Sequence, residues 1–414
     1  MVKNMRLFII DHFAGGPELG SRWHTWRLAK DLQERGVVVT VLTADFSHKR
    51  RHNLKVEHDF EETKIGDVPY CFVGTPSYDN TLGGRGRNIT TFLRKSWLAA
   101  RTLAQKYTPD VILCASAYPF DYYVAKRMTR YHRAKIIFEL QEIWPVMMQE
   151  LWGHNNDEIL VKASESALNK ALGASDRVLG VLPQGICYLE EHGISTQKYQ
   201  PFAHPADLTP KSDKLPKRKK EFAQRIRSNH SFLIVYQGFV AEEKCLNTLI
   251  AAAATLEESG VGVLICGNGG YKIQLKRVMR EHDADNVYLM DRIEPEETTA
   301  LYQMADCLFL GDSRSSAAQY GFVSSKLLEY MLAAKPVLCV TVASQSAATQ
   351  SGCGINVEEN SPRALAAAIQ KLLEMPPEAR CKMGSKGPDW IRKHHNPAVL
   401  GEQVYDCMKE LIDG

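Results

Sequence analysis

Two charged residues, three positions apart, stand near the start of an otherwise apolar helical pattern. Lys326 and Glu329 lie within GFVSSKLLEYMLAAKPVL, residues 321–338, which leads directly into a strand pattern. Ser324 and Ser325 precede them, and serine is a preferred residue at a helix N-cap. A lysine has the wrong sign for a helix N-terminus, where the dipole favours anions. The segment is therefore either an anion site or a solvated ion pair worth roughly 0.2–0.5 kcal/mol.

A phosphorylated ligand would account for these residues together. Free N–H groups at a helix N-terminus bind phosphate, and a neighbouring lysine adds positive charge. Glu329 lies one turn along the same helical face, where its carboxylate can accept two hydrogen bonds from a ribose diol. This interpretation predicts a nucleotide bound at residues 324–330.

Glycines at strand ends mark further candidate contacts to phosphate. Gly238 and Phe239 follow the apolar run LIVYQ, and Lys244 stands where the next helix begins. Gly267 follows VLIC in the same way, and Arg292 comes shortly after VYLM. A glycine lets a ligand approach the backbone closely, although a solvated lysine and a tight turn explain these residues equally well. The G-x-G-G spacing is not a dinucleotide motif, and the lack of a Walker A sequence argues against an ATPase.

The first half of the chain adds a second group of candidates. Gly20, Ser21 and Arg22 follow the first strand pattern, LFII at 7–10, and are expected to approach the ligand's phosphates from the opposite domain. Glu142 follows the strand pattern AKIIFEL and is a candidate base or anchor for a second substrate. An ordinary loop carboxylate is the alternative for Glu142.

The elements that must position these residues alternate along the chain. Short apolar runs such as VVVTVLT (37–43) and VGVLICG (261–267) are separated by helical patterns, which is typical of parallel sheets covered on both faces. The alternation breaks at 202–229, a polar, basic segment that is predicted to be a linker or a domain boundary. We therefore predict an α/β protein of two doubly wound, Rossmann-like domains, residues 1–203 and 204–396, with ligands at the carboxyl ends of the strands.

Composition and charge exclude several classes of protein. The 414 residues are 44% hydrophobic and 24% charged, and the net charge of +3 is too small to indicate a nucleic-acid partner. Ten cysteines without metal-type spacing favour a reducing, cytoplasmic location. No signal-peptide pattern and no apolar stretch of about 18 residues is present. The sequons at Asn88 and Asn229 are therefore expected to be chance matches.

One basic amphipathic segment leaves two interpretations open. Residues 83–106 combine Phe92, Trp97 and neighbouring leucines with basic residues that include Arg85, Arg87, Arg94, Lys95 and Arg101. Such a pattern suits peripheral contact with the inner face of a membrane, where the aromatic residues would insert. A solvated helix that packs its apolar side on the sheet is the alternative.

Three stretches together resemble the GT-B glycosyltransferases, specifically the retaining family 4 and its bacterial branch of amino-sugar transferases in surface polysaccharide assembly. They are PELGSRWHTWRLAKDLQERG, FELQEIWP and YGFVSSKLLEYMLAAKPVL, and the resemblance spans nearly the whole chain. It implies two facing Rossmann-like domains, an acceptor-side first domain and a sugar-nucleotide-binding second domain. It also implies diphosphate contact for Lys326, ribose contact for Glu329, and a final helix, 397–414, that crosses back onto the first domain.

The chain departs from this family at several positions. Gly321 stands where many relatives have a second glutamate, Phe239 where they have an arginine, and Tyr118 where they have a histidine. Gln141 and Glu142 replace an arginine and an aspartate. These departures predict either an unusual donor or acceptor, or a weakened enzyme.

The resemblance implies transfer of a hexosyl or N-acetylhexosaminyl group, with retention, from a UDP- or GDP-sugar to a glycan or lipid-linked acceptor. Lys244, Lys326 and Glu142 are the candidate catalytic residues, and no cofactor or metal ion is expected to be required. The alternatives are a sugar-nucleotide 2-epimerase-like enzyme and a nucleotide-sugar-binding protein with weakened catalysis.

Overall fold

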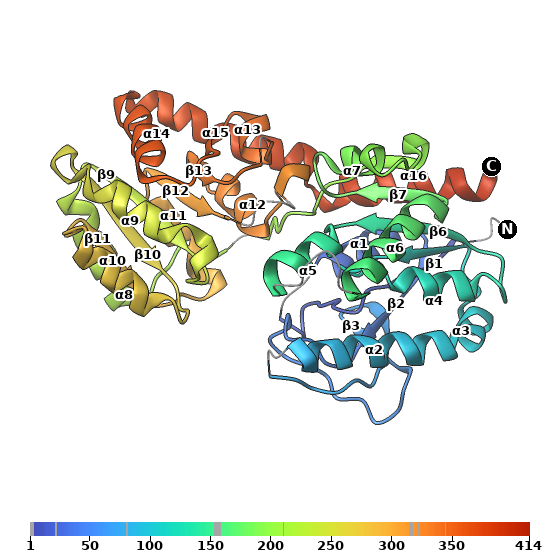
Figure 1. The fold of residues 1–414 in the computed structure, drawn as a ribbon. Helices are drawn as coiled ribbons and strands as arrows, with labels where there is room; N and C mark the ends of the chain where they lie inside the picture. Colours follow the sequence, from blue (N-terminus) through green and yellow to red (C-terminus); the bar gives the residue numbers. More distant parts are fainter. Residues whose placement is uncertain are drawn as a thin grey trace. The chain divides into compact units, whose positions relative to one another are not determined.

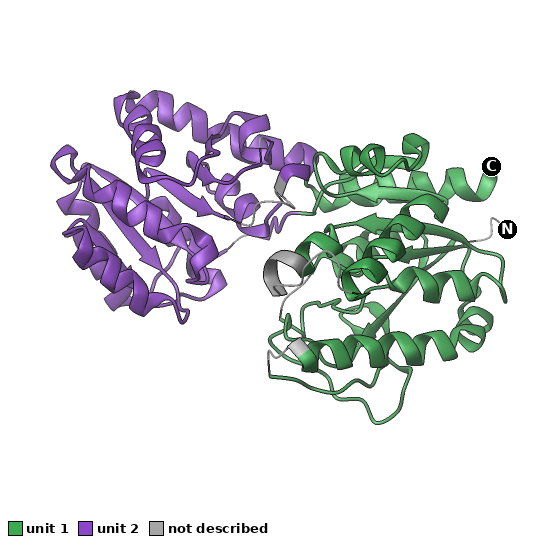
Figure 2. Ribbon diagram, viewed as in Figure 1, with its two compact units in different colours: residues 1–205, 395–414 green, residues 206–394 purple. Residues whose placement is uncertain are grey.

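The computed structural model describes residues 4–20, 23–79, 82–152, 159–209, 211–313, 318–321, 323–343 and 345–414. The chain divides into two compact units (Figure 2). Unit 1 contains residues 1–205 and 395–414, and unit 2 contains residues 206–394.

Unit 1 is built on an eight-stranded sheet. Its strands are β1 (Arg6–Ile10), β2 (Val38–Ala44), β3 (Glu61–Ile65), β4 (Val68–Val73), β5 (Val111–Cys114), β6 (Lys135–Leu140), β7 (Arg177–Gly180) and β8 (Tyr199–Pro201). They lie in the order β3-β4-β2-β1-β5-β6-β7-β8, and every pair is parallel except β3–β4. The parallel strands therefore end at one common edge.

Helices connect and cover these strands (Figure 1). They are α1 (His24–Glu34), α2 (Leu82–Leu98), α3 (Ala100–Tyr107), α4 (Asp121–Met128), α5 (Trp144–Trp152), α6 (Ile159–Ala174), α7 (Gly185–Glu191) and α16 (Pro397–Asp413), with a short 3-10 turn η1 (Thr196–Lys198). The final helix, α16, packs against α1. A Cβ atom on Gly401 would lie 1.7 Å from Asp31 Oδ2, so this glycine allows the close approach of the two helices.

Unit 2 repeats the plan with a six-stranded parallel sheet. Its strands are β9 (Phe232–Gln237), β10 (Val261–Cys266), β11 (Val287–Met290), β12 (Cys307–Gly311), β13 (Val337–Val340) and β14 (Gly354–Val357). Their order is β11-β10-β9-β12-β13-β14. Alternate residues of β9 enter two separate cores: Leu233 and Val235 face one, and Ile234 and Tyr236 face the other. A strand buried on both faces explains the uninterrupted apolar run.

The helices of unit 2 lie on both faces of that sheet (Figure 1). They are α8 (Lys217–Asn229), α9 (Leu246–Ala254), α10 (Lys272–Glu281), α11 (Thr298–Gln303), α12 (Ser325–Leu332), α13 (Ala347–Ser351), α14 (Pro362–Glu374) and α15 (Pro377–His394). Four 3-10 turns accompany them: η2 (Glu242–Lys244), η3 (Glu257–Ser259), η4 (Pro295–Glu297) and η5 (Ala318–Tyr320).

The predicted linker at 202–229 is shorter than expected. Its second half forms α8, whose Ala223 and Ile226 are buried in a core of unit 2. Only two of the thirteen residues of α8 are fully buried. The sequence of this helix is therefore too polar to show the apolar stripe by which a helix is predicted.

The basic segment at 83–106 forms α2 and most of α3. Phe92 is fully buried, so the interpretation that it inserts into a membrane is wrong. Trp97 is 42% exposed, and the Arg127 guanidinium lies 3.4 Å from its ring centroid. Asn88 is also buried, and its Oδ1 lies 2.7 Å from His12 Nε2. The asparagine of this sequon is therefore part of the core of unit 1. Within the described ranges, none of the helices combines the length and apolar character needed to cross a bilayer.

Candidate functional site

The start of α12 has the cap that its sequence predicts. Ser324 is the N-cap, and its hydroxyl accepts a hydrogen bond of 3.2 Å from the Lys326 backbone N–H. Ser325 is the first helical residue. Leu327 and Leu328 are buried in the core behind the helix, which leaves Lys326 on the more exposed side at the carboxyl edge of the unit 2 sheet.

Lys326 and Glu329 form the ion pair that their spacing suggests, within a larger network. Lys326 Nζ lies 2.8 Å from Glu329 Oε2, 2.6 Å from Gln237 Oε1 and 3.4 Å from the Tyr302 hydroxyl. The Tyr302 hydroxyl donates to Gln237 Oε1 at 2.9 Å. Tyr330 holds the backbone of Gln237, accepting from its N–H at 2.9 Å and donating to its carbonyl at 3.1 Å. Lys326 is therefore held in place by groups from three elements of unit 2.

A second lysine gives this network an excess of positive charge. Lys211 Nζ lies 3.4 Å from Glu329 Oε1, on the oxygen that Lys326 does not use. Two ammonium groups thus share one carboxylate, while Gln237 and Tyr302 are neutral. The side chains of Lys211, Lys326 and Glu329 are 17%, 26% and 24% exposed, so water screens the excess charge only in part. We refer to Lys211, Lys326, Glu329, Gln237 and Tyr302 as the α12 cluster.

The charged state of Glu329 follows from its neighbours. Burial by itself raises the pKa of Glu329, but the charges of Lys326 and Lys211 outweigh burial, so the pKa lies below its ordinary value. Burial raises the pKa of Tyr302 well above its ordinary value. At neutral pH the cluster therefore contains an ionised carboxylate that can accept hydrogen bonds and a neutral phenol.

The glycines after β9 and β10 lie where two loops run side by side. Gly238 N–H donates to Cys266 O at 3.0 Å. A Cβ atom on Gly267 would lie 1.8 Å from Gly238 O, and one on Gly269 would lie 2.0 Å from Val240 O. Contact between the loops therefore explains Gly267 without a ligand. A Cβ atom on Gly238 would lie 2.9 Å from the Tyr236 hydroxyl, a closer approach than ordinary packing allows.

Lys244 lies at the same edge of the sheet, in η2 after β9. Its Nζ is 3.3 Å from Asp312 Oδ2 and 3.9 Å from Glu243 Oε1, and its side chain is 21% exposed. A Cβ atom on Gly311 would lie 2.2 Å from Lys244 O, so the end of β12 passes directly beside this turn. Lys244 is therefore anchored by carboxylates and is not the freely solvated side chain of the alternative interpretation.

Two other predicted positions of unit 2 are more exposed. Phe239 is 67% exposed, and its carbonyl accepts a hydrogen bond of 2.6 Å from the Tyr236 hydroxyl. Arg292 has a half-exposed side chain, with Nη2 3.4 Å from Glu294 Oε2. Its backbone carbonyl accepts from Lys219 Nζ. The structure thus brings Arg292 into an ion pair on the surface and not into the α12 cluster.

The predicted positions of unit 1 form no comparable cluster among the described residues. Gly20 adopts φ +74°, and a Cβ atom there would lie 2.9 Å from Arg51. Ser21 and Arg22 lie outside the described residues. Glu142 lies in the segment between β6 and α5 and is partly buried.

The sequence reasoning missed three residues of the α12 cluster and one pair in unit 1. Lys211, Gln237 and Tyr302 come from segments far from α12 in the chain. In unit 1, Glu139 is fully buried in β6 and lies 2.7 Å from His24 Nε2. A glutamate inside the apolar strand AKIIFEL was a signal that could have identified Glu139.

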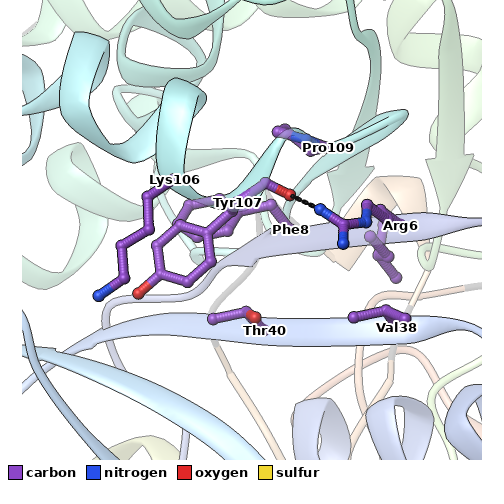
Figure 3. Close-up of a pocket in the computed structure, with 8 residues that line it drawn as sticks. Arg6, Phe8, Val38, Thr40, Lys106, Tyr107 and Pro109 are labelled. Atoms are coloured by element: carbon purple, nitrogen blue, oxygen red, sulfur yellow. Dashed lines mark hydrogen bonds between the residues drawn. The ribbon is translucent and has the colours of Figure 1, made fainter.

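A cavity of about 160 Å³ lies at the opposite edge of the unit 1 sheet, where β1 and β2 begin (Figure 3). Arg6, Thr40, Lys106 and Tyr107 line it, and Arg6 Nη1 donates to the Tyr107 carbonyl at 3.3 Å. Ligands of doubly wound sheets bind at the carboxyl ends of the strands, so this cavity is separate from the predicted site.

Comparisons with known proteins identify the class of fold. The chain is similar in structure to sucrose-phosphate synthase (tll1590) from Thermosynechococcus elongatus, with TM-score 0.72 and 17% identity over 99% of this chain and 100% of that one. It is also similar to Alr3699/HepE from Anabaena in complex with UDP and glucose, with TM-score 0.66 and 13% identity over 98% and 100% of the two chains. The predicted GT-B fold of two Rossmann-like domains is confirmed.

Sequence comparison adds a family for the second half of the chain. Residues 217–390 match the family described as glycosyl transferases group 1. A stretch of 148 residues is 26% identical to the putative colanic acid biosynthesis glycosyl transferase WcaI of Escherichia coli (strain K12). That stretch is 35% of this chain and 36% of the relative, so the match spans about a third of the relative's length. With the fold, these matches support a glycosyltransferase and do not favour the 2-epimerase alternative.

Proposed function

We propose that this protein is a retaining glycosyltransferase that moves a sugar from a nucleoside-diphosphate sugar to an acceptor hydroxyl, in the assembly of a surface polysaccharide or glycoconjugate. The observation that carries the proposal is the α12 cluster, in which two lysines share one ionised carboxylate beside a capped helix start. Its excess positive charge suits a diphosphate, and its carboxylate suits a ribose diol.

In this proposal the donor's nucleotide binds unit 2 at the α12 cluster. Glu329 accepts hydrogen bonds from the ribose hydroxyls, and Lys326 and Lys211 contact the diphosphate. Donor binding would draw the two lysines partly away from Glu329. The ribose hydroxyls would then replace the lost contacts by donating hydrogen bonds to the carboxylate. UDP is the nucleotide in HepE's complexes, and UDP or GDP is the nucleotide we expect here.

Catalysis would come mainly from electrostatic stabilisation of the leaving group. When the bond between the anomeric carbon and the phosphate oxygen breaks, the diphosphate gains negative charge. Cations held in place before the reaction stabilise that charge without reorganisation, typically contributing about 10²–10³ in rate. Lys326 and Lys244 are held by hydrogen bonds and ion pairs, as this role requires. Glu142 remains a candidate acceptor base or anchor, and we expect no requirement for a divalent ion.

A panel of donors tests the proposal. Calorimetry with UDP, GDP and dTDP should show binding of one of them. The matching sugar nucleotides, incubated with and without sugar acceptors and with and without EDTA, should release that diphosphate. NMR of the product should show the donor's anomeric configuration. Absence of nucleotide binding would refute the proposal, and binding without turnover would favour a nucleotide-sugar-binding protein with weakened catalysis.

A further inference from the structure

A histidine and a glutamate form a buried pair in unit 1. His24 begins α1, and Glu139 is the fifth residue of β6, one position before the strand ends. His24 Nε2 lies 2.7 Å from Glu139 Oε1, and the two side chains are 10% and 0% exposed. The parallel strands of this sheet end at the edge where doubly wound proteins bind ligands. The pair therefore lies near the functional edge of unit 1, on residues that motif reasoning did not select.

Both members of the pair have an unsatisfied polar atom. His24 Nδ1 and Glu139 Oε2 are buried, and neither has a hydrogen-bond partner among the described residues. Two rings pack against His24. The His204 ring stacks on it at 5.0 Å between centroids, and the Phe202 ring meets it edge-on at 6.5 Å. A buried polar atom without a partner typically costs about 1–3 kcal/mol. Two apolar residues would fill the same space without that cost, so stability alone does not explain the pair.

The hydrogen bonding defines which chemical group would complete the site. With Glu139 Oε1 as the acceptor of the hydrogen bond, His24 Nε2 is the donor and carries the proton. Nδ1 then has a free lone pair if the ring is neutral, and an N–H group if it is protonated. A hydroxyl both donates and accepts, so it can bond to Nδ1 in either state. A sugar, which offers several hydroxyls, is a ligand class that meets this requirement.

We propose that His24, oriented by Glu139, is a binding site in unit 1 for a hydroxyl of the acceptor sugar. The inference extends the proposed glycosyl transfer to the acceptor, for which it names the contact residue. His24 makes the contact, and Glu139 acts as a positioning residue that sets the tautomer and the ring orientation.

The first arm of the test measures binding without any reaction. The protein is labelled with ¹³C-histidine and titrated with methyl β-D-glucopyranoside, and the His24 ring signal is identified by its loss in His24→Gln. We expect that signal to shift saturably, while the signal of His58, which is exposed, stays in place. Dioxane at the same concentration, which has ring oxygens but no hydroxyl, should cause no shift. An unmoved His24 signal, or an equal shift with dioxane, overturns the inference.

The second arm uses UDP-glucose as donor and n-octyl β-D-glucopyranoside as acceptor. Loss of one hydrogen bond to a partly charged group should raise the acceptor KM of His24→Gln about 10- to 100-fold. Glu139→Gln should have a smaller effect in the same direction, and His58→Gln should have none. The affinity for UDP should stay within about twofold in all three. If His24→Gln keeps the wild-type acceptor KM, the inference fails while the proposed function stands.

The proposed function can also fail while the His24 contact is still tested. If the wild-type protein binds no UDP, GDP or dTDP, the proposed function fails. The NMR titration still decides whether His24 binds a sugar hydroxyl, because it needs no donor. A misfolded His24→Gln would lose the circular dichroism and nucleotide affinity of the wild type, and His24→Asn then serves as the second variant in both arms.

Discussion

Replacing Glu329 by glutamine tests the α12 cluster most sharply, because it removes one charge and keeps the shape of the side chain. In the free protein, Glu329 faces Lys326 at 2.8 Å and Lys211 at 3.4 Å. Each pair has a gross Coulomb attraction of roughly 5–6 kcal/mol at an effective dielectric constant of about 20. Desolvation offsets most of that attraction. We expect the free energy of unfolding to fall by a net of about 1–3 kcal/mol.

The same substitution should affect nucleoside and nucleotide binding differently. A carboxylate that accepts hydrogen bonds from a ribose diol contributes about 1.5–3 kcal/mol, so the affinity for uridine should fall about 10- to 150-fold. The affinity for UDP should fall less than the affinity for uridine, because the two lysines released from Glu329 attract the diphosphate more strongly. The ratio of the UDP and uridine association constants should therefore increase in Glu329→Gln.

Calorimetry with uridine and with UDP measures both quantities, at low and at moderate salt. Glu258→Gln is the matched control, because Glu258 is an exposed glutamate of the same unit. If GDP proves to be the nucleotide, guanosine and GDP take the place of the uridine pair. Equal nucleoside affinity in Glu329→Gln and Glu258→Gln would refute the ribose contact. A parallel loss for nucleoside and nucleotide would refute the electrostatic reasoning about the lysines.

The remaining predictions concern the lysines and the effect of pH. Lys326→Ala and Lys244→Ala should each lower turnover at saturating donor by roughly 10²-fold, and a wild-type rate in either would contradict the role in stabilising the leaving group. Lys211→Ala should weaken UDP binding about 5- to 20-fold by loss of a charge-assisted contact, whereas Lys214→Ala, an exposed lysine of the same segment, should leave calorimetric affinity unchanged. Because the pKa of Glu329 is lowered in the fold, its stabilisation is present above the unfolded-state pKa and is lost as the pH falls through the folded-state pKa. Urea unfolding at about pH 7 and about pH 3 should therefore differ less in Glu329→Gln than in the wild type, and an unchanged difference would contradict this assignment.

The architecture could be predicted because buried parallel strands leave a direct trace in the sequence. Strands such as β9 and β10 are buried on both faces, so nearly every residue is apolar and the run ends where the strand ends. The cap of α12 could be predicted for a similar reason, since a serine before an apolar helix is a local signal. The helix α8 could not be predicted, because only two of its side chains are buried and they give no visible periodicity of apolar residues.

The composition of the α12 cluster could be predicted only in part. Lys326 and Glu329 lie one turn apart, so their contact follows from helix geometry alone. Gln237 ends β9 and Tyr302 lies in α11, and only the folded sheet brings them to Lys326. Lys211 comes from the polar segment before α8, where one lysine cannot be distinguished from its neighbours. The two interpretations of the Lys326–Glu329 spacing prove compatible: the ion pair forms, and Lys211 leaves it with an excess positive charge.

The departures from the family pattern differ in their physical origin. Gly321 has φ +104°, a conformation in which a glutamate would be strained by about 1–3 kcal/mol. A glutamate at position 321 would therefore require a strained backbone or a shift of the loop before α12. Phe239 is 67% exposed, so its backbone would accept an arginine without rearrangement. The change at Gly321 is thus built into the loop before α12, whereas the change at Phe239 concerns only the side chain.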